Sequence, residues 1–210
     1  MNAIVARLLE QPFVYRWWMA PFAEQKLRPL RENGGTSGVR RVLDVGCGPG
    51  TNAGEFAHTD YLGIDVNPLY IQNARDRHPG KFMVADVTTF EAEPDDRFDC
   101  ILVNSLLHHI PTPEVRRLLG HLETLLTEDG AIHIIELVLP PRPSAPRLLA
   151  KLDRGDYPRP RAEWELIFSS HFEPVVCNPH PVGAFGISLW EMIYFKGRRR
   201  ANAARIRASQ

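Results

Sequence analysis

The stretch VLDVGCGPGTN, from Val42 to Asn52, decides the fold of this 210-residue chain. An apolar run typical of a buried strand leads into Gly46, Gly48 and Gly50, which occupy alternate positions. In an α/β protein the turn after the first strand is where a nucleotide approaches the backbone, and glycine permits that close approach. The stretch therefore predicts a nucleotide-binding loop, and the nature of the nucleotide depends on the acid Asp44 that precedes it.

The spacing of the glycines and the position of Asp44 disfavour a dinucleotide. The dinucleotide fingerprint GxGxxG requires its third glycine at position 51, which is Thr51 here. We expect Asp44, at the carboxyl end of its strand, to face the ligand crevice. At about 4 Å a carboxylate repels a phosphate by roughly 1 to 4 kcal/mol, depending on the dielectric, and attracts an ammonium or sulfonium equally. A cationic ligand end fits this acid.

Two further strand-like runs also end in acids. YLGID ends at Asp65, about 20 residues after the glycine loop, where a carboxylate can accept both ribose hydroxyls. KFMVAD ends at Asp86, which is suited to the exocyclic amine of an adenine, with Val87 beside it. Alternatively, Asp86 caps a helix that follows it. Three parallel strands that each end in an acid at one sheet edge predict a site for an adenine nucleoside.

Short apolar runs alternate with helical stretches from Arg40 to Val138, which is typical of βα units around a mainly parallel sheet. The clearest helix is predicted over Glu114–Leu126, with Thr112 as its cap. Two consecutive strands near the C-terminus predict an antiparallel hairpin that turns through Pro181 and Gly183. In the first 32 residues, prolines at positions 12, 21 and 29 predict several short helices.

Composition excludes several classes of protein. The chain is 44% hydrophobic and carries 25 basic and 25 acidic residues, so no overall field favours nucleic acid or a membrane. Three widely spaced cysteines without a CxxC pair argue against disulfides and a zinc site, and we expect no metal. Neither a signal peptide nor an apolar run of about 20 residues is visible. We expect a cytoplasmic protein whose basic C-terminal tail is solvated and binds no nucleic acid.

The runs VLDVGCGPGTN, YLGIDVNP, FMVADV and FDCILVNSLLHHI, in this order, resemble the successive motifs of class I S-adenosylmethionine-dependent methyltransferases. The resemblance covers about Arg40 to Val138. It implies an α/β three-layer sandwich with a seven-stranded, mostly parallel sheet of order 3-2-1-4-5-7-6, whose last strand is antiparallel. It also implies an N-terminal helical lid and linker over 1–38, a methyltransferase domain over 39–197 and a basic tail over 198–210.

The resemblance further implies which residues hold S-adenosylmethionine, and its product S-adenosylhomocysteine, in this chain. The methionine end is assigned to the first strand and its loop, with a contribution from the end of the fourth strand. The ribose is assigned to Asp65, and the adenine to Asp86 and Val87. The full set of expected cofactor contacts is Asp44, Gly46, Cys47, Gly48, Gly50, Asn52, Asp65, Val66, Asp86, Val87 and Asn104.

His108 and His109 are the candidate catalytic residues. They follow Asn104 by about one helical turn, beyond the expected strand edge, and a histidine with a pKa near neutrality is suited to general-base catalysis. His109 is the first choice, and the alternative is that either ring packs structurally. His133 is expected to be buried, whereas Glu136 is a weaker candidate for the site.

Other side chains are candidates for the surroundings of the acceptor. The aromatic residues of the N-terminal segment, Phe13, Tyr15, Trp17 and Trp18, suit either a lid or a core. In the loop LDRGDYPRP, residues Arg154, Tyr157 and Arg159 suit an acidic or phenolic substrate, although a solvated surface is the preferred interpretation.

The sequence predicts an enzyme that transfers a methyl group to an O, N or C atom of a small-molecule acceptor. Asn104 is followed by Ser105-Leu106-Leu107 and not by a Pro-Pro-Tyr/Phe run, which disfavours adenine and glutamine amides as acceptors. The alternative is a non-catalytic cofactor-binding module or partner subunit with the same fold. A nicotinamide oxidoreductase is disfavoured by Thr51 and Asp44, and a homodimer remains open.

Overall fold

A computed structural model describes residues 12–92, 96–152, 155–184 and 186–200, with only the backbone described for 12–21. The strands form one seven-stranded sheet of order β3-β2-β1-β4-β5-β7-β6. All neighbouring pairs from β3 to β5 are parallel, whereas β7 is antiparallel to both β5 and β6. The predicted strand order and the antiparallel last strand are confirmed. The strands are β1 Arg41–Val45, β2 Asp60–Asp65, β3 Lys81–Val84, β4 Phe98–Asn104, β5 Leu126–Leu137, β6 Glu173–Ala184 and β7 Ile187–Arg198.

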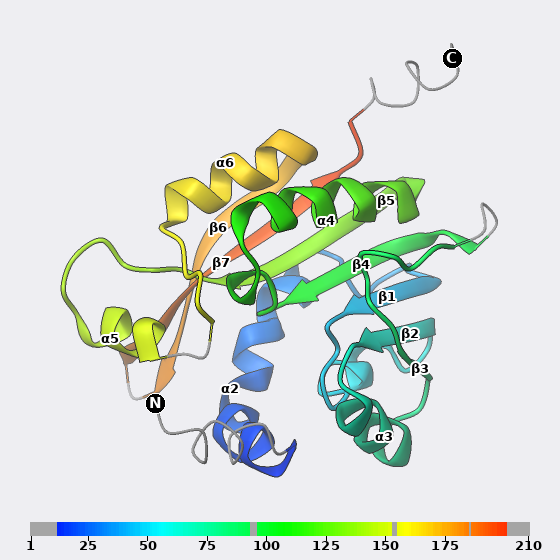
Figure 1. Cartoon of the computed structure of the whole chain (residues 1–210), viewed down its shortest axis with the longest axis horizontal. Coiled ribbons are helices and arrows are strands. Elements are labelled where there is room, and N and C mark those ends of the chain that lie inside the picture. The colour runs from blue at the N-terminus through cyan, green and yellow to red at the C-terminus, as the bar shows by residue number, and fades with distance from the viewer. Residues whose placement is uncertain (1–11, 93–95, 153–154, 185, 201–210) are drawn as a thin grey trace.

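Helices cover both faces of the sheet, which gives the predicted three layers (Figure 1). One face carries α4 and α6, and the other carries α2, α3 and α5. Short 3₁₀ turns, η1 and η3, follow β1 and β4 at their carboxyl ends. The bounds are α2 Pro12–Glu32, η1 Ala53–Phe56, α3 Pro68–Arg77, η3 Leu107–His109, α4 Thr112–Leu125, α5 Ala145–Leu152 and α6 Arg161–His171.

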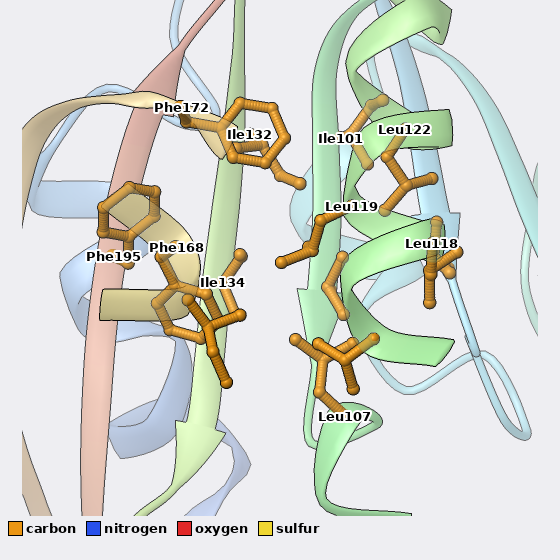
Figure 2. Packing of buried hydrophobic residues seen from close by; sticks show 14 of the residues in the cluster. Ile101, Leu107, Leu118, Leu119, Leu122, Ile132, Ile134, Phe168, Phe172 and Phe195 are labelled. Carbon is orange, nitrogen blue, oxygen red and sulfur yellow. The ribbon is translucent and has the colours of Figure 1, made fainter. Parts of the chain in front are cut away.

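Alternating side chains of the strands divide the core into two clusters. In β4, Ile101 and Val103 pack toward α4 and α6, whereas Cys100 and Leu102 pack toward α2 and α3. Because successive residues of a strand point to opposite faces, a strand covered on both sides is apolar throughout. Figure 2 shows the first cluster, in which leucines of α4 and phenylalanines of α6 and β7 meet over β4 and β5. This packing fixes the carboxyl ends of the strands, where the candidate site lies.

Two predicted details of the helices and strands were wrong. The segment with three prolines forms one helix, α2, which runs through Pro21 and Pro29. A proline inside a helix removes one backbone hydrogen bond, but the rest of the helix continues when packing supports it. Leu27 and Leu30 supply that packing, because both are buried against the sheet. The alternation of strands and helical stretches also predicts a helix between β1 and β2, but only the short turn η1 lies there.

The C-terminal hairpin is longer than predicted. Pro181 and Gly183 lie within β6, and the turn comes after Ala184 and before Ile187. β6 also contains Pro174 and Pro179, and it pairs with β7 on one side only. A proline is tolerated in an edge strand because its missing N–H need not be replaced by another strand. The prolines therefore do not end the strand.

Candidate active site

The glycine loop folds back over the end of β2. Gly46, Gly48 and Gly50 have φ values of 67°, 55° and 82°, in the left-handed region that disfavours other residues. The amides of Gly46 and Cys47 both donate to the carbonyl oxygen of Ile64, at 2.8 and 3.0 Å. The loop is thus fixed to β2 by its backbone, and its turn depends on glycine.

The three glycines differ in what surrounds them. A methyl group at Gly46 would come within 3.0 Å of Leu106 Cδ1, and one at Gly50 within 2.9 Å of the His78 ring. A methyl group at Gly48 would meet nothing within 4 Å. Gly46 and Gly50 therefore pack against protein, whereas Gly48 leaves open space above the loop, where a ligand can approach the backbone.

Asp44 is buried beneath the loop and does not line an open crevice as expected. Its carboxylate accepts bonds from Tyr61 Oη at 2.6 Å and from Asn52 Nδ2 at 3.0 and 3.3 Å. Asn104 Nδ2 in turn donates to Asn52 Oδ1 at 3.1 Å. These four side chains connect the ends of β1, β2 and β4. These internal donors supply the polar partners that a buried carboxylate needs.

Burial raises the pKa of Asp44 to about 6, although the bonds from Tyr61 and Asn52 oppose the increase. Asp44 is therefore largely ionised at neutral pH. Its negative charge lies under the glycine loop in a medium of low dielectric, where it favours a cationic ligand.

The raised pKa predicts a specific dependence of stability on pH. The pKa of Asp44 in the folded protein exceeds its ordinary value of 3.8. The protonated side chain therefore stabilises the fold fully below about pH 4, and this stabilisation is lost as pH rises through 6. About two pKa units correspond to about 3 kcal/mol. The free energy of unfolding of the natural chain, minus that of Asp44→Asn, should fall by about this amount between pH 4 and pH 7 in denaturant titrations. A constant difference would contradict the prediction.

Asp65 ends β2 beside the loop. Its Oδ2 accepts the amide of Gly48 at 3.0 Å, and its Oδ1 accepts the amide of Asn67 at 2.8 Å. Each carboxylate oxygen can accept a second bond, so both remain suited to hydroxyl donors. The next residue, Val66, is 68% exposed although it is apolar. An acid flanked by an exposed apolar side chain suits a ribose with a base beside it.

Asp86 follows β3, and its carboxylate caps the backbone that comes next, which agrees in part with the predicted role as a helix cap. Its Oδ1 accepts both the amide and the hydroxyl of Thr88, at 2.9 and 2.8 Å, and the amide bond is the first cause of its lowered pKa. Those bonds cap a turn and not a helix. Asp86 is exposed, and Val87 is half-buried against the core. At the end of β3, Val84 pairs with Asp65 of β2 and is 47% exposed although it is apolar.

The end of β4 continues the same edge of the sheet. Ser105 has a φ of 56°, which is uncommon for a residue other than glycine, and its amide donates to Ile135 O of β5 at 2.8 Å. η3 follows and carries both candidate histidines. His109, the preferred candidate, is exposed. His108 is 3% exposed, and its Nδ1 lies 2.5 Å from Glu136 Oε1. Glu136 therefore reaches His108 and not the open site.

The loop that precedes α6 packs against η3 through Arg159. The Arg159 guanidinium donates to the carbonyl oxygens of Leu107, Tyr157 and Ile110 at 3.2, 3.0 and 2.7 Å, and it lies over the Trp164 ring at 4.6 Å. Arg159 is 4% exposed, so the preferred interpretation of a solvated arginine was wrong for it. Its remaining contacts are also within the protein, with Thr112 Oγ1 at 3.0 Å and Glu163 Oε1 at 3.4 Å.

The remaining candidates of this region divide between the surface and the interior. Tyr157 is 42% exposed, and Arg154 lies outside the described residues. His133 is buried, as expected, with its Nδ1 2.8 Å from Tyr194 Oη, and burial lowers its pKa to about 3. The N-terminal aromatic residues proposed as a lid lie in 12–21, where no side chains are described.

Sequence reasoning missed the residues that support the site from below. Tyr61, the second residue of β2, donates a hydrogen bond to Asp44. The one feature of the sequence that could have indicated this bond is a tyrosine hydroxyl among the apolar residues of the strand. Gly155 lies directly against the His108 ring, so any side chain there would collide with the imidazole. Gly63 similarly leaves room for the buried Cys47, where a methyl group would come within 2.9 Å of Sγ. All three contacts are long-range.

Two kinds of site are absent from the part of the chain that the structure describes. No group of three His, Cys, Asp or Glu side chains is arranged to hold a metal ion among these residues. Among the same residues, no helix has both the length and the apolar character that a membrane span requires.

The chain resembles known methyltransferases in sequence and in fold. A family model described as a methyltransferase domain matches residues 42–130. An uncharacterized methyltransferase of Mycobacterium tuberculosis is 33% identical over 108 residues, which is 49% of this chain and 53% of that protein. A trans-aconitate 2-methyltransferase of Methylobacterium radiotolerans is 30% identical over 121 residues, which is 54% of this chain and 45% of that protein. The chain spans about half the length of the curated relatives that it matches.

Solved structures share the fold. The N-methyltransferase NodS of Bradyrhizobium japonicum, in complex with S-adenosylhomocysteine, has a TM-score of 0.67 and 18% identity, over 84% of this chain and 86% of that chain. At this identity the likeness concerns the fold alone. Residues 42–130 therefore match a methyltransferase domain, and the order of the seven-stranded sheet is that of the class I S-adenosylmethionine-dependent methyltransferase fold.

Proposed function

We propose that this chain transfers a methyl group from S-adenosylmethionine to a small-molecule acceptor. The observation that carries the proposal is the arrangement at one sheet edge of an open glycine loop, a half-exposed Asp65 and a buried anion, Asp44. A diphosphate would be repelled by these acids, whereas a sulfonium nucleoside is attracted. When bound, S-adenosylmethionine supplies an electrophilic methyl group on a cationic sulfur.

Each part of the site has a proposed role. Gly48 would allow the cofactor to approach the loop backbone, and Asp65 would accept the ribose hydroxyls. Asp86 and the exposed Val66 would hold the adenine between a polar and an apolar side chain. Asp44 would act through its charge from beneath the loop, because its oxygens already have internal donors. Orientation of the two reactants is the main catalytic contribution expected of such a site.

The small-molecule acceptor is supported by the names of the relatives. Several relatives are named trans-aconitate 2-methyltransferases, and NodS is named an N-methyltransferase. The first name specifies a small organic acid and the second an accepting nitrogen, so the names support a small acceptor without selecting O, N or C for this chain. The three unpaired cysteines are typical of a reducing compartment and support a cytoplasmic location.

Calorimetry and a transfer assay test the proposal in sequence. Titration with S-adenosylmethionine, S-adenosylhomocysteine and NADH should give binding of the first two compounds only. Incubation with S-adenosylmethionine carrying a labelled methyl group, and with phenols, amines and carboxylates, should then label at least one acceptor class. Binding without transfer to any acceptor would favour the alternative of a non-catalytic binding module, and preferential binding of NADH would contradict the cofactor.

A further inference from the structure

The Tyr61 hydroxyl lies beneath the glycine loop and donates to the Asp44 carboxylate at 2.6 Å. Both side chains are buried, with Tyr61 3% exposed and Asp44 fully covered. In the pairing of β1 with β2, Val42 lies opposite Tyr61 and Asp44 lies opposite Gly63. Alternate residues of a strand share one face, so Tyr61 and Asp44 are diagonal neighbours on the same face of the sheet.

The packing of the tyrosine ring fixes the direction of its hydroxyl. The Tyr61 ring stacks on Phe56 with centroids 5.9 Å apart and meets Phe82 edge to face at 5.5 Å. A methyl group at Gly80 would come within 2.9 Å of the same ring. A phenylalanine would make all of these contacts. The hydroxyl is therefore the one part of this side chain that the packing does not require.

The proton of this hydrogen bond belongs to the tyrosine. Burial, and then the charge of Asp44, raises the pKa of Tyr61 well above its ordinary value of 10, whereas the pKa of Asp44 is about 6. A phenol that keeps its proton donates it to a carboxylate, so this bond favours the ionised form of Asp44. The nearby charge of Asp65 raises the pKa of Asp44. The neighbouring thiols of Cys47 and Cys100 stay protonated, because burial raises the pKa of each.

A purely structural role explains the hydroxyl less well. Asn52 Nδ2 already gives Asp44 a donor at 3.0 Å, and Asn104 Nδ2 holds Asn52 Oδ1 at 3.1 Å. These bonds connect β1, the loop and β4 without the tyrosine. A buried carboxyl group that was neutral would need fewer donors than a charged one. A second donor side chain on Asp44 therefore points to a requirement that this group carry its charge.

We propose that Tyr61 is a positioning residue that keeps Asp44 fixed and negatively charged beneath the cofactor. The inference rests on the proposed function and names what the charge distinguishes. S-adenosylmethionine carries a cationic sulfur, whereas the sulfur of S-adenosylhomocysteine is neutral. A buried anion attracts the cationic sulfur only. The charge therefore strengthens binding of the methyl donor relative to the product, and it favours replacement of the product by fresh cofactor after each transfer.

Carbon resonances of the aspartate carboxyl groups test the pair of side chains in the absence of a cofactor. Asp44→Asn identifies the Asp44 signal in the labelled natural chain. In Tyr61→Phe the pKa of Asp44 should rise by at least about one unit, because a donor to the charged form is lost. Tyr194→Phe is the matched control, since Tyr194 is also buried but its hydroxyl lies 2.8 Å from His133 Nδ1. An unchanged pKa of Asp44 in Tyr61→Phe would overturn the proposal.

Incorporation of 3-fluorotyrosine gives a second measurement, which needs no substitution at Tyr61. Fluorine lowers the pKa of a phenol and makes its hydroxyl a stronger donor. The pKa of Asp44 should therefore fall in the natural chain that carries the analogue, and the fall should persist when the analogue is incorporated into Tyr194→Phe. A pKa of Asp44 that stays constant or rises would count against the bond as the source of the charge, even if Tyr61→Phe did not fold.

Calorimetry at two pH values tests the effect on the cofactor. At pH 6, Tyr61→Phe should bind S-adenosylmethionine about fivefold more weakly than the natural chain, the factor expected when the pKa of Asp44 rises by one unit from about 6. S-adenosylhomocysteine should lose less affinity, and at pH 8.5 the two proteins should bind alike. A loss of the same size at both pH values, or for both compounds, would overturn the proposed role. If the natural chain binds neither compound, the proposed function fails, while the carboxyl resonances still judge the pair of side chains.

Discussion

Asp65→Asn is expected to bind S-adenosylmethionine roughly 100- to 10,000-fold more weakly than the natural chain. Two charge-assisted bonds to ribose hydroxyls would be lost, each of which contributes about 1.5 to 3 kcal/mol. The asparagine amide would also point its N–H groups at the amide of Gly48 or of Asn67, which now donate to Asp65. The loop would then lose one anchor as well. Isothermal calorimetry of both proteins measures the change.

Asp76→Asn is the matched control for this experiment. Asp76 is exposed on α3 and accepts a bond from Gln72 at 2.9 Å, away from the glycine loop. It should leave the affinity for S-adenosylmethionine unchanged while removing the same charge. If both variants bind equally well, Asp65 does not contact the ribose, and the assignment of β2 to the nucleoside fails.

Gly48→Ala is expected to weaken cofactor binding at least 100-fold, a loss of about 3 kcal/mol. The new methyl group would occupy the open space above the loop, where the cofactor is proposed to approach the backbone. A residue other than glycine at a φ of 55° also costs roughly 1 to 2 kcal/mol of stability. Calorimetry for affinity and denaturant unfolding for stability separate these two effects.

Gly38→Ala distinguishes strain in the backbone from obstruction of the ligand. Gly38 lies between α2 and β1 with a φ of 70°, and a methyl group there would also meet nothing within 4 Å. Both variants should lose a similar amount of stability, but only Gly48→Ala should lose affinity. Equal affinities in the two variants would mean that no ligand lies above Gly48.

The sheet and its functional edge were predictable because their signals are local. The apolar run Val42–Val45 and the three glycines that follow it predict a strand and a tight turn within eleven residues. Asp65 and Asp86 follow their own strands at once, and parallel pairing then brings the strand ends together. The strand order itself came from the resemblance of the ordered motifs to a family, and the structure confirms it.

The supporting contacts were not predictable because they join distant parts of the chain. Asp44 depends on Tyr61 and Asn52, and only the register between β1 and β2 brings the tyrosine under the loop. His108 depends on Glu136, which lies 28 residues later, in a neighbouring strand. No local pattern specifies that a carboxylate will be buried or which donor will reach it.

A rule applied locally also failed where tertiary packing opposed it. The rule that proline ends a helix predicts breaks at Pro21 and Pro29, but α2 continues through both. Each proline removes one hydrogen bond, whereas Leu27 and Leu30 bury apolar surface only if the helix continues. Burial of these two leucines outweighs the lost hydrogen bonds, so the helix continues.

The proline-rich edge strand bears on how the protein associates with other copies of itself. An exposed strand edge offers amide hydrogens to any other extended chain, which is the usual origin of sheet-to-sheet aggregation. Pro174, Pro179 and Pro181 have no such hydrogens, so β6 is a poor template for an added strand. Concentrated solutions of the protein should therefore resist fibril growth from this side, and a dimer that extends the sheet would have to form at β3, its other edge.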